Sequence, residues 1–68
     1  MRVHAKEFTS MKGHVADGCE IIGLDGRVYT LKNTMSGWRV CDAANTEISG
    51  NLKSAFDVEC FVIYGLGI

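Results

Sequence analysis

The sequence contains no proline and only three cysteines among its 68 residues. Without proline, its turns have to be made by glycine together with asparagine, aspartate and serine. Cys19, Cys41 and Cys60 are odd in number, widely spaced and free of any Cys-x-x-Cys pair, which disfavours both a disulfide framework and a structural zinc site. We therefore expect buried, reduced thiols and a reducing, intracellular setting.

Long apolar runs and an excess of charge are also missing. No stretch approaches the roughly 20 apolar residues of a membrane span. Residues 1–7 alternate between charged and apolar side chains and do not form the apolar centre of a signal peptide. The formal net charge is -1, which offers nucleic-acid phosphates no basic field. These absences predict a cytoplasmic protein that does not enter membranes and for which nucleic acid is not the favoured partner.

Apolar residues and glycines are abundant. Hydrophobic residues make up 47% of the chain, charged residues make up 22%, and there are eight glycines. This composition excludes intrinsic disorder as the main state, because disordered chains combine low hydrophobicity with high net charge. The glycines divide the chain into segments of strand length. We expect a single small domain, residues 1–68, whose core is only just sufficient for its size.

The clearest predicted element is a β-hairpin with strands at 20–24 and 27–31, joined by Asp25-Gly26. Asp-Gly favours a two-residue type I′ turn, which would place Ile22 opposite Tyr29. Both faces of the pair are then apolar near the middle. Such a pair is typical of the inside of a small barrel or sandwich.

Three further strands are predicted. One covers 37–41, with Trp38 and Val40 pointing inward, and a second hairpin about Gly50-Asn51 joins 46–49 to 52–54. An alternative gives this last region a helix N-cap, at Asn51 or Ser54, and one short helical turn before Phe56.

The segment 56–64 alternates at period 2 and then becomes apolar on both faces, which predicts the strongest strand of the chain. Residues 1–12 fit both the periodicity of a strand and the periodicity of a helix. Alternation predicts a strand as far as Phe8 and a loop after it, whereas Ala5, Phe8 and Met11 would share a helical stripe that ends at Gly13. We favour the strand.

Together these segments predict a mainly β domain, a small antiparallel barrel or curled sheet of about five short strands with at most one short helix. From Glu20 to Val62, the order of hairpin, tryptophan strand, polar connection and apolar closing strand resembles the SH3-like and Sm-like small barrels, including the bacterial Rho-inhibitor family. Asp25-Gly26 and Trp38 carry this resemblance of layout, and it transfers no functional residue. The predicted core consists of Ile22, Leu24, Val28, Trp38, Val40, Ile48, Phe56, Val58, Phe61 and Ile63.

Candidates for catalysis are few. His14, Asp17 and Cys19 lie within six residues and would suit a thiol enzyme or a metal site, but a solvated loop beside a buried cysteine explains them as well. We expect no enzyme activity, no metal and no cofactor. The alternative function is a small β-barrel that binds single-stranded nucleic acid through basic and aromatic side chains on two successive strands. Its residues would be Arg27, Tyr29, Lys32 and Arg39.

Protein association is the favoured function. Residues 61–68 carry six large apolar side chains and no charge. A small fold can cover one face of such a strand and leaves the other to pair with another chain, unless the strand is central and wrapped on both faces. We therefore expect a non-enzymatic intracellular binding or regulatory module, as a homodimer or on a larger partner, which would suit a small accessory protein of bacteria, phages or mobile elements. The predicted contact residues are Phe61, Ile63, Tyr64 and Leu66.

Overall fold

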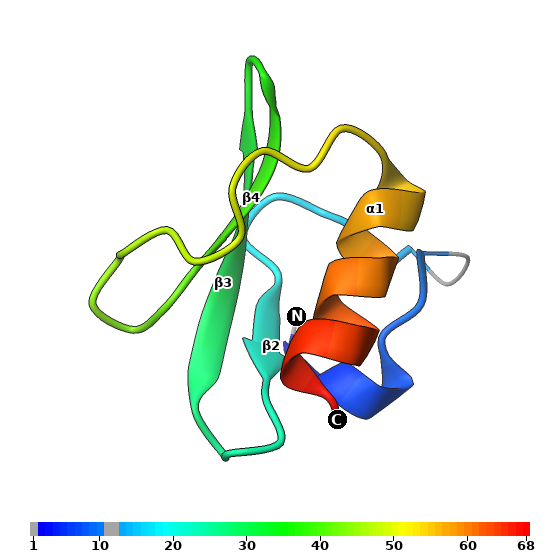
Figure 1. Cartoon of the computed structure of the whole chain (residues 1–68), viewed down its shortest axis with the longest axis vertical. Coiled ribbons are helices and arrows are strands. Elements are labelled where there is room, and N and C mark those ends of the chain that lie inside the picture. The colour runs from blue at the N-terminus through cyan, green and yellow to red at the C-terminus, as the bar shows by residue number, and fades with distance from the viewer. Residues whose placement is uncertain (1, 11–12) are drawn as a thin grey trace.

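The computed structural model describes residues 2–10 and 13–68. In this part of the chain one four-stranded sheet, ordered β1-β2-β3-β4, packs against a C-terminal helix (Figure 1). β1 runs parallel to β2, and the other two pairs are antiparallel. The elements in chain order are β1 (Arg2–His4), the 3-10 turn η1 (Ala5–Glu7), β2 (Glu20–Ile22), β3 (Val28–Thr34), β4 (Gly37–Cys41), α1 (Ala55–Cys60) and its π-helical continuation η3 (Phe61–Leu66).

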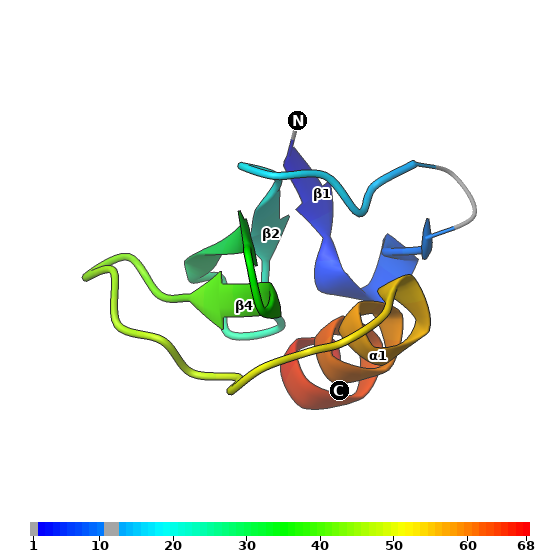
Figure 2. The same cartoon turned by 90° about the horizontal axis from the view of Figure 1, so that it is seen from above.

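The predicted mainly β class with one short helix is confirmed, but the sheet is open and the described residues form neither a closed barrel nor a fifth strand. Along β3, Tyr29 and Leu31 are buried, whereas Val28, Thr30 and Lys32 are only partly so. This alternation belongs to a sheet with one covered face. Figure 2 shows α1 and the N-terminal segment on that side of the sheet. The largest fully buried side chains are Phe8, Ile21, Leu31, Val40, Val58 and Val62.

The predicted hairpin between β2 and β3 is confirmed, but its type I′ turn is wrong. The N–H of Gly26 donates to the Gly23 carbonyl at 3.0 Å, and within the loop only Gly26 has a positive φ, of 82°. Leu24, Asp25 and Gly26 therefore form a three-residue loop, a type I turn followed by a left-handed glycine. The Asp25 side chain stabilises it by accepting a hydrogen bond from the N–H of Arg27 at 2.9 Å.

This longer loop shifts the register of the hairpin. Ile21 pairs with Tyr29, and Ile22 pairs with Val28. Because side chains alternate along a strand, a shift by one residue exchanges the inward and outward faces. The predicted core is corrected accordingly. Val40 and Val58 are buried, Ile22, Val28, Trp38, Phe61 and Ile63 are half-buried, and Leu24, Ile48 and Phe56 are exposed.

The predicted strand at 56–64 is wrong, because this segment is helical. The hydroxyl of Ser54 accepts a hydrogen bond from the N–H of Asp57 at 3.2 Å and caps the helix. Val58 and Val62, four residues apart, are both buried. The alternative N-cap at Ser54 is confirmed, and the helix is longer than one turn. No helix in the described part of the chain is long and apolar enough to cross a membrane.

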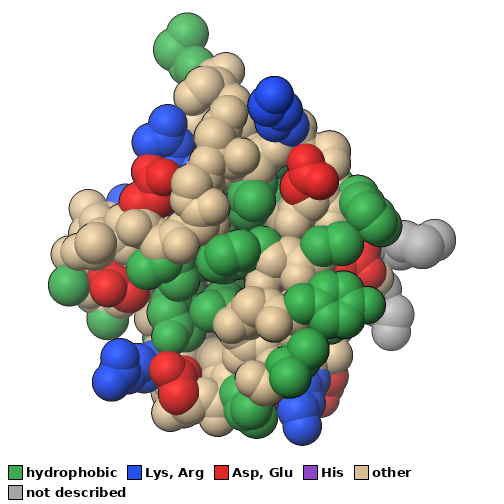
Figure 3. Space-filling view, in the orientation of Figure 1, with side chains coloured by type: hydrophobic (Ala, Val, Ile, Leu, Met, Phe, Trp, Pro, Cys, Tyr) green, Lys and Arg blue, Asp and Glu red, His purple; other side chains and the backbone are tan. Residues whose placement is uncertain are grey.

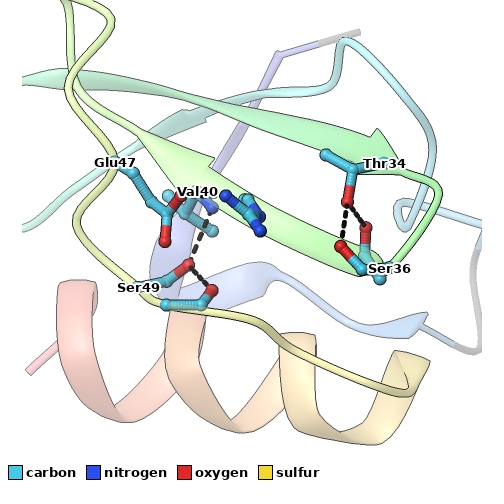
Figure 4. A network of polar contacts seen from close by, with 8 residues as sticks. Thr34, Ser36, Val40, Glu47 and Ser49 are labelled. Atoms are coloured by element: carbon cyan, nitrogen blue, oxygen red, sulfur yellow. Dashed lines mark hydrogen bonds and ion pairs between the residues drawn. The ribbon is translucent and has the colours of Figure 1, made fainter.

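The second predicted hairpin is also wrong, because its two arms do not pair with each other. Both return instead to the outer edge of β4. Trp38 exchanges two backbone hydrogen bonds with Leu52, at 2.7 and 2.8 Å, and the N–H of Ile48 donates to the Val40 carbonyl at 2.9 Å. The hydroxyl of Ser49 accepts from the N–H of Val40 at 2.9 Å (Figure 4). These contacts satisfy backbone groups that an open edge would leave exposed.

At the N-terminus the predicted strand is too long, because β1 ends at His4 and η1 follows it. Ala5 and Phe8 are both buried, with 1% of each exposed, as the helical alternative expected. The third member of that stripe, Met11, lies outside the described residues. Burial of this stripe favours a turn of helix over further alternation.

Candidate contact surface

The C-terminal helix is apolar on two opposite faces. Val58 and Val62 are fully buried against the sheet. Phe56 and Tyr64, which are offset from them by two positions, lie on the outer face. Phe56 is 70% exposed, Tyr64 is 69% exposed, and Ile68 in the tail is 75% exposed. We call Phe56, Tyr64 and Ile68 the helical contact surface.

The C-terminal half of the helical contact surface carries no charge. No Asp, Glu, Lys or Arg occurs in residues 60–68. In the preceding turn, the carboxylate of Glu59 accepts a hydrogen bond from the Ser10 hydroxyl at 2.8 Å, which directs it towards the N-terminal segment. Figure 3 shows apolar side chains over α1 and across the middle of this side of the molecule, with charged side chains of both signs mostly around them.

Of the four contact residues predicted from sequence, only Tyr64 is exposed. Phe61, Ile63 and Leu66 are half-buried and pack against the core. The Leu66 carbonyl also accepts a hydrogen bond from the N–H of Leu24 at 2.7 Å, which ties the helix end to the hairpin loop. Association by strand pairing is corrected here, because the segment is a helix and offers no strand edge.

Phe56 and Ile68 are exposed, but they are not among the contact residues predicted from sequence. Both lie at multiples of four positions from Tyr64, so helical spacing would have grouped them. The signal was the Ser54-x-x-Asp57 capping pattern, but the alternative based on an N-cap at Ser54 extended the helix by only one short turn before Phe56.

Two residues of the nucleic-acid alternative lie beside the hairpin loop, Tyr29 on β3 and Arg27 just before it. Tyr29 is 9% exposed, and its hydroxyl donates to Asp25 Oδ2 at 3.0 Å. Arg27 Nε lies 3.7 Å from the same oxygen, and the Arg27 side chain is 80% exposed. The ring of Tyr29 is thus part of the core and presents no open face for stacking a base.

The other two, Lys32 and Arg39, are cross-strand neighbours on β3 and β4. Arg39 Nη1 donates to Glu47 Oε1 at 2.7 Å, and the Lys32 ammonium donates to the Asn45 side chain. Each cation therefore already has a partner within the chain. The structure does not bring these four residues together as one basic and aromatic surface, and the nucleic-acid function stays a prediction.

The Asp25–Tyr29 contact predicts a dependence of stability on pH. The backbone N–H of Arg27, followed by the Tyr29 hydroxyl, holds the pKa of Asp25 below its ordinary value. Stability from ionised Asp25 is fully present above the ordinary pKa of about 3.9 and is lost as the pH falls through the lower folded value. We expect Asp25→Asn to be less stable than the parent at neutral pH, with a gap that closes in acid. Urea titrations across that range measure this, and parallel pH profiles would contradict it.

Two residues of the candidate thiol site, Asp17 and Cys19, contribute to the fold. Asp17 Oδ1 accepts a hydrogen bond from the N–H of Asn33 at 2.9 Å, and Cys19 is 2% exposed. Burial raises the pKa of Cys19, which disfavours the thiolate that nucleophilic chemistry needs. The other two thiols are also free, one buried and one half-buried.

The described residues bring together an apolar surface, and they include no group of three or more His, Cys, Asp or Glu side chains that could hold a metal ion. An apolar surface binds by removing its area from water, at about 25 cal/mol per Å². This arrangement suits contact with another apolar surface. No family model, no curated protein and no solved structure matches the chain.

Proposed function

We propose that the protein is a non-enzymatic binding module that acts through protein contacts, and that its helical contact surface binds a second copy of the chain. One observation carries the proposal. The C-terminal helix is apolar on both faces, and the sheet covers only one of them. Large apolar side chains exposed on one face of a small protein are a common mark of an interaction site.

Charge favours a second copy as the occupant. In a two-fold dimer the same surface faces itself, so any net charge on it would be repelled. Residues 60–68 carry none, and the whole chain has a formal net charge of only -1. Both features let two copies approach without repulsion.

The size of the molecule also allows such a dimer. A standard interface buries about 800 Å² on each partner. This is roughly a fifth of the 4165 Å² that the chain exposes. An interface of this size leaves most of the surface of the chain exposed.

Sedimentation equilibrium over a concentration series up to high micromolar tests the proposal. The parent chain is expected to associate to a dimer. Tyr64→Glu places a charge in the middle of the helical contact surface and is expected to weaken the dimer about tenfold or more, because the charge would be buried without a partner. Circular dichroism checks that the variant is folded.

Met35→Glu is the matched control. Met35 is another exposed apolar residue, at the turn between β3 and β4, so the substitution adds the same charge outside the proposed interface. It is expected to leave the dimer unchanged. A strictly monomeric parent, or equal weakening by the two variants, would overturn binding to a second copy.

A further inference from the structure

A second surface, independent of the helical contact surface, forms an open groove of about 630 Å³ beside the start of β3. One wall comes from Val28 on β3. The opposite wall comes from the loop that follows β4 and carries Ala43, Ala44 and Ile48. Figure 1 shows this loop swinging out beside β3 before it returns towards α1. The volume falls within the range of sites that bind small molecules.

The loop wall is held in place by its own hydrogen bonds. Asp42 Oδ1 accepts from the N–H groups of Ala44 and Thr46, at 3.0 and 2.9 Å. Asn45 adopts a left-handed φ of 65°, and its side chain accepts a hydrogen bond from Lys32 on β3. The groove is therefore largely formed before any ligand arrives, which reduces the entropy lost on binding.

The lining is apolar except at its ends. Val28 is half-buried, and Ile48 is 39% exposed, so both have apolar area left to cover. Of the two charged residues that line the groove, Asp42 already uses one carboxylate oxygen for two backbone N–H groups. The other is Arg27, at the end of the hairpin loop.

Of these two charged residues, Arg27 is the one with spare hydrogen-bond donors. Its side chain is 80% exposed, and the ion pair with Asp25 joins only Nε to Oδ2, at 3.7 Å. Asp25 itself is occupied by the Arg27 N–H and the Tyr29 hydroxyl. A guanidinium in this state matches a carboxylate, which it can bind through two parallel N–H donors.

We propose that this groove binds a small carboxylate that has an aromatic or branched aliphatic body. The carboxylate lies on the Arg27 guanidinium, and the apolar body lies between Val28 and Ile48. Because Asp25 and Asp42 stand nearby, the attraction for an anion is moderate. We expect a dissociation constant on the order of 0.1–1 mM for a simple probe.

The test is a titration of the ¹⁵N-labelled chain with 1-naphthoate, with 1-naphthamide as its neutral analogue. Naphthoate is expected to shift the amide signals of 27–29 and 42–48 in a saturable way, and naphthamide to bind about tenfold more weakly. Arg27→Gln is expected to weaken naphthoate binding about tenfold, and Ile48→Ser to weaken both probes.

Arg2→Gln is the matched control. Arg2 is another exposed arginine with an acidic partner, Glu20 at 3.3 Å, and it does not line the groove. Arg2→Gln removes the same charge as Arg27→Gln and is expected to leave the affinity for naphthoate unchanged. Absence of saturable shifts, equal affinity for the two probes, or equal effects of the two arginine variants would overturn the proposal. The result is independent of the dimer, because Tyr64→Glu lies outside the groove and is expected to bind naphthoate normally.

Discussion

Replacing Leu31 with alanine is expected to remove about half of the protein's free energy of unfolding. Leu31 is 0% exposed in β3, the most central long strand, where it pairs with Val40. Truncating a fully buried leucine costs about 2–5 kcal/mol. A domain of 68 residues has a free energy of unfolding of about 3–10 kcal/mol in total. Circular dichroism and urea titration measure the loss.

Leu24→Ala is the matched control, because it removes the same atoms from a side chain that is 58% exposed in the hairpin loop. We expect it to cost less than about 1 kcal/mol. The pair also tests the register of the hairpin, since the two-residue turn expected from the sequence would place Leu24 in the core. A loss at Leu24 as large as the loss at Leu31 would contradict the three-residue loop.

The hairpin shows how far local sequence determines this fold. Its existence and the position of β4 follow from alternation and from the Asp-Gly and Ser-Gly signals. The turn type of the hairpin does not follow from these signals. The side chain of Asp25 accepts a hydrogen bond from the N–H of Arg27 and thereby favours a type I turn. One residue of difference in the loop exchanges the two faces, so a small local error became a large error in the predicted core.

The C-terminal segment shows a different limit. Residues 56–60 alternate between apolar and acidic, and the same apolar positions also fit a helix that buries Val58 and Val62. Contact with the sheet selects the helix over the strand for this segment. The periodicity of the sequence carries no information about that contact. Of the contact residues predicted in the uncharged segment 61–66, only Tyr64 is exposed, and the exposed Phe56 and Ile68 are not among them. The groove beside β3 had no sequence signal, because the loop after β4 creates it.

Gly37→Ala is the second substitution with a large expected effect. Gly37 has a φ of 137°, which side chains other than glycine rarely adopt. A Cβ atom there would lie 2.6 Å from the Leu52 carbonyl oxygen and 2.5 Å from Asn51 Oδ1. The backbone at Gly37 would have to move away from the backbone at Leu52, and the two hydrogen bonds between Trp38 and Leu52 would be lost. Strain and lost hydrogen bonds together predict a cost of about 2–5 kcal/mol, measurable by urea titration and by faster amide exchange at Trp38.

Gly50→Ala separates the conformational part of this cost from the contact part. Gly50 also has a positive φ, of 72°, but a Cβ atom there would meet nothing within 4 Å. We expect a cost of about 1 kcal/mol, from the left-handed backbone alone. Adding Asn51→Gly to Gly37→Ala should recover only part of the loss, because the Leu52 carbonyl still meets the new methyl group. If Gly37→Ala cost no more than Gly50→Ala, the edge of β4 would not depend on the close approach of Leu52, and the segment that carries the groove wall would be held by its other contacts.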